Sequence, residues 1–305
     1  GLKTFEDEMI YFGQGDGTPK INPFFIPKMI ADSSSGQISI RNGFRGPNYV
    51  TVSACSSANN AIIDAFNYIR TGRINVCVTG GSEAPVTIAS VGGFTAMHAM
   101  STRNDDPATA SRPYDVDRDG FVVGEGAGAL ILEEYEHAKA RGAKIYAELI
   151  GGGFSSDAHH ITAPHPEGYG ALLSMIDALE DANIKPEEVD YVNTHGTSTP
   201  IGDPQEIKAI VDCFGEHAYK LAISSTKSMT GHLLGGAGAV EAVASVLAIQ
   251  HQFVPPTINV FNRDPEIDQR IDLTENVGKA RKIDVALSNG FGFGGHNATV
   301  IFRKI

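Results

Sequence analysis

The chain has 305 residues, of which 42% are hydrophobic and 20% charged, a composition typical of a folded globular protein. Its formal net charge of -12 at pH 7 argues against a nucleic-acid-binding protein, whose binding surface would be basic. No apolar run approaches the roughly 18 residues that cross a bilayer, so we expect no membrane partner and a cytoplasmic location.

Strand-like and helix-like segments alternate along the chain, which predicts an α/β fold. Residues 49–52 read as a strand, and apolar residues at helical spacing from Ala58 to Ile69 predict a helix that ends near Gly72. A buried strand at 74–78 follows. A further strand at 126–133 and a helix at 136–141 complete a first half, which we place at residues 1–146.

A second half, residues 147–305, repeats this rhythm of strand, small-residue turn and helix. We expect Val240, Val243, Ala244 and Leu247 to face inward from its last helix. The predicted helices are 169–183, 204–214 and 237–250, and the predicted strands are 189–194, 221–224, 285–288 and 299–302.

Cys55 lies at the joint between the first predicted strand and its helix, in "VTVSACSSANNAI". The unpaired N–H groups of a helix start stabilise a thiolate, so this position predicts an acidified, nucleophilic thiol. Cys77 lies within a predicted strand and Cys213 on the apolar side of a helix, and both are better explained as structural residues. The three cysteines are odd in number and lack metal-ligand spacing, so we expect reduced thiols and no metal site.

Two histidines also follow predicted strands, each among small residues: His195 in "THGTSTPIGD" and His232 in "SSTKSMTGHLLGGAGAVEA". The second segment adds Lys227 and Glu241. Taken singly, the histidines are compatible with capped loop residues, and the lysine and glutamate with solvated charges. Together with Cys55 they suggest thiol-based acyl transfer assisted by two neutral imidazole donors.

Motifs along almost the whole chain resemble those of the elongating β-ketoacyl-acyl-carrier-protein synthases, close to the synthase II enzymes. They include "SACSSA", "GGSEA", "STRNDDPATASRPYDVDRDGFVVGEGAG", "SSDAHHITAP", "PPTIN" and "NGFGFGGHN", in the expected order. The resemblance implies a thiolase-like α/β/α/β/α five-layer sandwich of two duplicated halves. It also implies that a further amino-terminal region precedes the matched segment, so we expect the first half to be incomplete.

Carried onto this sequence, the resemblance implies that Cys55 accepts the acyl group and that His195 and His232 are the active-site histidines. Lys227 matches the lysine of the second histidine loop, and Glu241 its carboxylate partner. Phe293 matches the gating phenylalanine, whose N–H would form an oxyanion hole with that of Cys55. The matched substrate-binding positions are Thr162, Thr197, Thr199 and Phe94.

The resemblance further implies decarboxylative condensation of malonyl-acyl carrier protein with an acyl chain on Cys55. No cofactor is expected, because the substrates arrive on the phosphopantetheine arm of acyl carrier protein. The expected partners are acyl carrier protein, which is acidic, and a second copy of the chain in a homodimer. Four basic residues could meet the carrier: Lys20, Arg41, Arg45 and Arg73.

Other interpretations remain open on the sequence alone. The chain could be an inactive fragment or a non-catalytic chain-length partner, although such partners typically lack the nucleophile that Cys55 provides. A thiolase would need a second catalytic cysteine late in the chain, where "NGFGFGGHN" has none. A cysteine hydrolase is the least favoured interpretation, because the sequence provides no Cys–His–Asn order that would activate water. Gly290 and His296 stand where the resembled family often has hydroxyl residues, which could alter gating.

Overall fold

The structure, a computed structural model, describes residues 1–18 and 20–305. The elements of the first half are α1 (Leu2–Gln14), α2 (Phe25–Met29), α3 (Ser33–Asn42), α4 (Ser57–Arg70), β1 (Val76–Glu83), α5 (Ile88–Ala96), β2 (Gly126–Glu133) and α6 (Tyr135–Ala140). Those of the second half are β3 (Glu148–Ser156), α7 (Tyr169–Ala182), β4 (Tyr191–Asn193), α8 (Gly202–Phe214), β5 (Ala222–Ser224), α9 (Lys227–Thr230), α10 (Ala237–His251), β6 (Phe253–Val254), β7 (Lys279–Ala280), β8 (Val285–Gly292) and β9 (His296–Arg303).

A five-stranded sheet with the order β3-β9-β8-β4-β5 forms the centre of the molecule. Strand β4 pairs in parallel with both β5 and β8, whereas β8 and β9 form an antiparallel hairpin. All three residues of β4 and of β5 are buried, as expected for parallel strands covered on both faces. The carboxyl ends of β4 and β5 therefore lie at one edge of the sheet, where ligands gather in α/β proteins.

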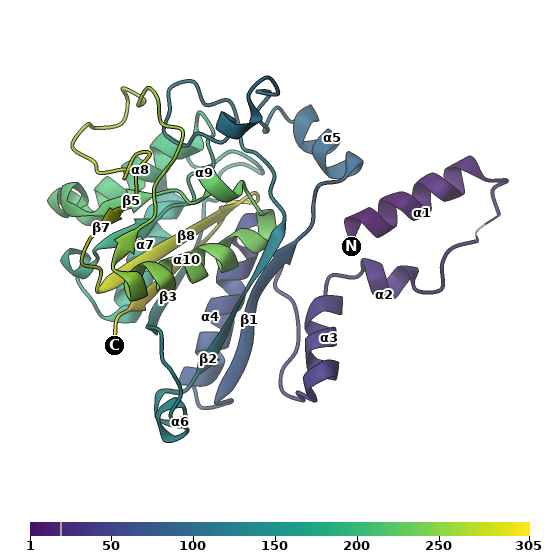
Figure 1. The fold of residues 1–305 in the computed structure, drawn as a ribbon, viewed down its shortest axis with the longest axis horizontal. Coiled ribbons are helices and arrows are strands. Elements are labelled where there is room, and N and C mark those ends of the chain that lie inside the picture. Colours follow the sequence, from purple (N-terminus) through teal and green to yellow (C-terminus); the bar gives the residue numbers. More distant parts are fainter. Residues whose placement is uncertain (19) are drawn as a thin grey trace.

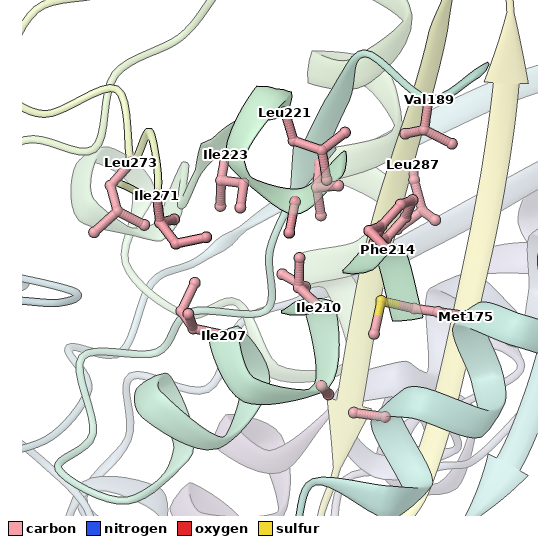
Figure 2. Close-up of a cluster of buried hydrophobic side chains, with 14 of the residues drawn as sticks. Met175, Val189, Ile207, Ile210, Phe214, Leu221, Ile223, Ile271, Leu273 and Leu287 are labelled. Carbon is pink, nitrogen blue, oxygen red and sulfur yellow. The ribbon is translucent and has the colours of Figure 1, made fainter. Parts of the chain in front are cut away.

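Helices α7 and α8 pack on one face of this sheet. Helices α4 and α10 lie between its other face and the antiparallel pair of strands β1 and β2 (Figure 1). Figure 2 shows the core beneath α8, where Ile207, Ile210 and Phe214 recur at helical spacing and point toward the sheet. Met175 of α7 and Leu287 of β8 complete the contact. The described residues thus form alternating helix and sheet layers, in agreement with the expected thiolase-like sandwich.

Strand β1 pairs only with β2 among the described residues. The two strands form an antiparallel pair from Val76↔Glu133 to Glu83↔Gly126. Leu130 and Leu132 of β2 pack toward the core, whereas Ile131 between them is 69% exposed. The β1–β2 strand pair therefore packs one face against α4 and α10 and leaves the other face open.

Three expectations about the elements are wrong. The strand expected to be buried at 74–78 runs instead from Val76 to Glu83 and is not buried, since Val76 is 45% exposed and only one face of β1 is covered, by α4 and α10. Residues 49–52 form no strand, and Val52 is 84% exposed. An extended segment becomes a strand only when a neighbour accepts its backbone hydrogen bonds, and the described residues offer it none. Helix α10 also turns a different face inward: Glu241, Ala242 and Ser245 are buried, while Leu247 is 42% exposed.

Helices α1, α2 and α3, at the amino-terminal end, extend away from this body in Figure 1. One link back is the carboxylate of Glu6 in α1, which accepts a hydrogen bond of 2.7 Å from the N–H of Ala89 in α5. Large apolar side chains remain exposed along this segment, including Phe24 at 65% and Ile40 at 76%. The core that positions the site is therefore formed by the rest of the chain.

Candidate active site

Cys55 lies in a single 3-10 turn, Ala54–Ser56, directly before α4, at the joint that the sequence predicted. Ala58, Ile62 and Ala65 of α4 are buried, so the apolar stripe of the helix fixes this turn against the core. The backbone N–H of Phe293, in the turn between β8 and β9, acts to lower the pKa of the Cys55 thiol and so lies beside it. The predicted nucleophile is therefore held from two sides, by its own helix and by the β8–β9 hairpin.

The expected acidification of Cys55 is wrong for the unliganded site. Burial raises the pKa of the thiol to about 11, although the Lys227 charge and the Phe293 N–H both act to lower it. Desolvation therefore outweighs these two opposing effects and disfavours the thiolate. Cys55 is therefore a protonated thiol at neutral pH.

His195 follows β4 and His232 follows α9, and their rings meet edge to face with centroids 5.3 Å apart. Burial, followed by the nearby Lys227 charge, lowers the pKa of both imidazoles well below the ordinary value. Nδ1 of His195 accepts a hydrogen bond of 3.3 Å from the N–H of Phe291, so in the neutral ring Nε2 carries the proton. Both histidines are thus neutral, which leaves each ring one N–H to donate.

Lys227 and Glu241 form a buried ion pair rather than solvated charges, since their residues are 1% and 2% exposed. The lysine lies at the start of α9 and the glutamate one turn into α10. The positive charge of Lys227 lowers the pKa values of Cys55, His195 and His232 alike. All three predicted catalytic side chains therefore surround one buried cation.

The β8–β9 hairpin brings the halves of the site together. The N–H of Phe291 donates to His195, and the N–H of Phe293 lies beside Cys55, where it acts to lower the pKa of the thiol. On its other side, the N–H of Gly294 donates to the carbonyl of Ile161 over 2.6 Å. This contact places the segment that contains Thr162 beside the Phe293 turn, and the hydroxyl of Thr162 lies 3.3 Å from Nδ1 of His160.

Thr197 and Thr199 lie in the same loop as His195, and their hydroxyl oxygens are 3.1 Å apart. The buried Arg118 holds this loop through hydrogen bonds to the carbonyls of Thr199 and Pro200, both 2.9 Å long. The predicted threonines are therefore fixed beside the first histidine.

Phe94 of α5 reaches the site indirectly, through Phe121, which sequence analysis did not single out. The ring of Phe94 meets that of Phe121 with centroids 5.3 Å apart, and Phe121 meets His232 at 5.4 Å. Backbone pairing of Val123 with His232 holds the Phe121 segment in place. Phe94 therefore lies one aromatic ring away from the histidines.

Glu206 is a second functional residue that sequence analysis missed. Its carboxylate accepts hydrogen bonds of 2.8 Å from the N–H groups of His195 and Gly196, and one of 3.1 Å from the amide of Asn289. Burial raises its pKa to about 7. Its position in the sequence could have indicated a buried carboxylate, because it lies three residues after Asp203 and directly before Ile207, on the inward face of α8.

Gly290 and His296, which stand where the resembled family often has hydroxyl residues, occupy different surroundings. Gly290 is buried in β8, whereas His296 is exposed at the start of β9. A side chain at Gly294 would lie 2.8 Å from Nε2 of His296. Both residues belong to the hairpin that contacts Cys55 and His195.

No group of three or more metal-binding side chains occurs among residues 1–18 and 20–305. Within the same part of the chain, every helix is too short or too polar to cross a membrane. Cys55, Cys77 and Cys213 are all free thiols, and Cys213 packs against the core of the second half.

Family profiles match both halves of the chain: the "Beta-ketoacyl synthase, N-terminal domain" at residues 3–138 and the "Beta-ketoacyl synthase, C-terminal domain" at residues 146–261. The 3-oxoacyl-[acyl-carrier-protein] synthase 2 of Synechocystis sp. is 53% identical over 304 residues. That match covers 100% of this chain and 72% of the relative. A protein with the same name from Staphylococcus aureus is 49% identical, with the same coverage.

Solved structures agree with this assignment. A β-ketoacyl synthase from Burkholderia phymatum superposes with a TM-score of 0.91 at 37% identity, covering 100% of this chain and 72% of the other. A ketosynthase solved with its type II polyketide acyl-carrier protein superposes with a TM-score of 0.96 at 35% identity, covering 100% and 75%. These matches favour a condensing enzyme over a thiolase or a non-catalytic partner. The chain belongs to the β-ketoacyl synthase family.

Proposed function

We propose that the chain elongates fatty acids by two carbons, through decarboxylative Claisen condensation of malonyl-acyl carrier protein with an acyl chain held on Cys55. The observation that carries this proposal is the convergence of one thiol and two neutral imidazoles around the buried Lys227–Glu241 pair. A thiol suits acyl storage, and neutral N–H donors suit a developing enolate.

In the first step, Sγ of Cys55 attacks the thioester carbonyl of an acyl carrier protein. A new S–C bond forms, the bond to the carrier sulfur breaks, and the thiol proton of Cys55 ends on the departing carrier thiol. The N–H groups of Cys55 and Phe293 form the oxyanion hole. The Phe293 N–H acts to lower the pKa of the Cys55 thiol, and this effect supports its role beside the nucleophile.

In the second step, malonyl-acyl carrier protein loses carbon dioxide, and the electron pair of the broken C–C bond becomes an enolate on the thioester oxygen. His195 and His232 donate hydrogen bonds to that oxygen. The enolate carbon then attacks the acyl carbonyl on Cys55. A C–C bond forms, the Cys55 thiolate leaves, and it takes up one proton from solvent.

The remaining predicted residues act by orientation. Lys227 provides a fixed positive charge beside the nucleophile, and Glu241 holds that charge in place. Thr197, Thr199 and Thr162 bind the pantetheine arm or the malonyl group. Their positions beside His195 and the Phe293 turn support this assignment.

Acyl carrier protein is the proposed partner, in keeping with the carrier complex of a similar ketosynthase. Lys20, Arg41, Arg45 and Arg73 are exposed and could contact an acidic carrier. We also propose a homodimer, Phe94 as an aromatic residue near the acyl entrance, and a boundary between the two halves at residues 146 and 147. No cofactor is needed by this mechanism, and the cytoplasm is the proposed location.

The direct test is to incubate the 305-residue chain with an acyl-acyl carrier protein and malonyl-acyl carrier protein. Mass spectrometry should show a transient acyl adduct on Cys55 and a 3-oxoacyl product extended by two carbons. Acylation without extension would contradict the condensing function, and absence of both would contradict the whole proposal.

A further inference from the structure

Asn59 lies on α4 four residues after Cys55, and its side chain is completely buried. Its Nδ2 donates a hydrogen bond of 3.1 Å to the carbonyl of Ala298 in β9 and makes a longer contact of 3.5 Å with the carbonyl of Ser288 in β8. Oδ1 has no hydrogen-bond partner among residues 1–18 and 20–305. One carboxamide thus links the nucleophile helix to both strands of the hairpin that contains the Phe293 turn.

Glycines on two elements make room for this carboxamide. A Cβ at Gly290 of β8 would lie 2.9 Å from Nδ2, and one at Gly238 of α10 would lie 1.9 Å from Oδ1. Real Cβ atoms do not approach so closely, so neither position accepts a side chain while Asn59 keeps this pose. Gly290 is one of the two departures noted in the sequence, and Asn59 fills the space that a larger residue there would take.

The same face of β8 also meets the backbone around Cys55. A Cβ at Gly292 would lie 2.7 Å from the carbonyl oxygen of Ser53 and 2.9 Å from the backbone nitrogen of Cys55. Gly290 and Gly292 point to the same side of the strand, since side-chain directions alternate. The hairpin therefore lies directly against the segment from Ser53 to Asn59, and Asn59 supplies its hydrogen bond to that segment.

We propose that Asn59 is a positioning residue that sets the distance between the two N–H groups of the oxyanion hole. One of these groups belongs to Cys55, at the start of its helix, and the other to Phe293, at the turn of the hairpin that Asn59 holds. Acyl transfer needs both donors aimed at one oxygen. This inference rests on the proposed acyl-transfer function.

The test compares two reactions of the same thiol in the full 305-residue chain. Transfer from an acyl N-acetylcysteamine thioester passes through an oxyanion, whereas alkylation by iodoacetamide displaces iodide and needs no oxyanion hole. We expect Asn59→Ala to lower the acylation rate at saturating thioester about tenfold or more, because small displacements in a preorganised site have large kinetic effects. Its alkylation rate should change less than twofold, and its KM for the thioester should be unchanged.

Asn67→Ala is the matched control, since it removes a carboxamide from the same helix two turns further from Cys55. Asn59→Asp serves if the alanine variant does not fold, because it keeps the shape but replaces the donor with an acceptor facing two carbonyl oxygens. Gly290→Ala should lower acylation in the natural background and have less effect when combined with Asn59→Ala, since the added Cβ then has space.

Three outcomes would overturn the inference. In the first, both reactions of the Asn59 variants slow equally, which indicates a general structural role. In the second, acylation is unchanged. In the third, the natural chain is alkylated but never acylated, which contradicts the proposed function as well. The first two leave the proposed function intact, so the two failures are distinguishable.

Discussion

The antiparallel strand pairs β8–β9 and β1–β2 differ in their connections and in their surroundings. Residues 293–295 join β8 to β9, whereas residues 84–125, which include α5, separate β1 from β2. Strand β8 lies between β9 and β4, with helices on both faces of the sheet. Strand β1 has only β2 beside it among the described residues, and one face of the pair is open. Ile301 in β9 is fully buried, whereas Ile131 in β2 is 69% exposed.

The segments that precede helices α10 and α4 differ in the same way. Strand β5 precedes the loop that leads to α10, and it pairs in parallel with β4. The segment 49–53 precedes α4 in the corresponding position, but no strand lies beside it in the described part of the chain. A strand-forming sequence thus becomes a strand only where a neighbour is available.

The comparison has a functional consequence. The nucleophile belongs to the more open half, and both histidines belong to the half with the complete sheet. The first half therefore contributes the nucleophile, and the second half contributes both histidines and the Phe293 N–H. The β8–β9 hairpin, which lies beside Cys55 and contacts His195, joins them. The following predictions test this division, beginning with the largest effect.

Replacing the nucleophile should abolish one step only. Cys55→Ala removes the sole group proposed to store the acyl chain, so we expect no acyl adduct and no elongation. Decarboxylation of malonyl-acyl carrier protein should persist, because its donors lie in the second half. Intact-mass measurement and carbon dioxide release are the readouts. Cys77→Ala is the control, and continued elongation by the Cys55 variant would disprove the assignment.

Removal of either histidine should produce the opposite pattern. His195→Ala or His232→Ala is expected to slow decarboxylation by about 10²–10³-fold, the effect of losing one preorganised donor. Acylation of Cys55 should be largely retained, because the oxyanion donors remain. Mass spectrometry of the adduct and carbon dioxide release separate the two steps. Loss of the acyl adduct in both variants would contradict the division between the halves.

The β8–β9 and β1–β2 strand pairs should respond differently to the same substitution, made at a buried position in the first and at an exposed position in the second. Ile301→Val removes a fully buried methylene and should lower the free energy of unfolding by about 0.5–1.5 kcal/mol. Ile131→Val makes the same change at an exposed position of β2 and should change it by less than about 0.5 kcal/mol. Urea titration of both variants tests the difference. Equal losses would show that the outer face of β2 is covered in solution.

Decarboxylation should be insensitive to mild acid. The pKa values of His195 and His232 lie well below the ordinary value of 6.5, so both rings stay neutral as the pH falls from 8 to 6. Each ring is half protonated only when the pH reaches its lowered pKa. Carbon dioxide release by Cys55→Ala, measured over this range, should therefore lose less than about twofold through the histidines. Glu206 itself has a pKa of about 7, so the same measurement is made with Glu206→Gln added; a drop centred near pH 6.5 that persists there would show that the rings titrate normally.

Much of the fold and site could be predicted from sequence because the signals are local. Cys55 at a helix start, His195 after a strand and the inward stripe of α8 all follow from spacing along a short segment. The inward face of α10 could not be predicted this way. Glu241 is buried there because Lys227 neutralises it, and no local pattern reports that partner.

The sequence by itself determined the family, the alternation of helices and strands, and the residues that surround the site, because motifs and periodicity act over a few positions. Only the tertiary structure decided the protonation of those residues. Burial raises the pKa of Cys55 against the opposing effect of the Lys227 charge, whereas burial and Lys227 together lower the pKa values of the histidines. The contacts of Asn59 and Glu206 likewise join segments that are distant in the chain, and such contacts exist only after folding.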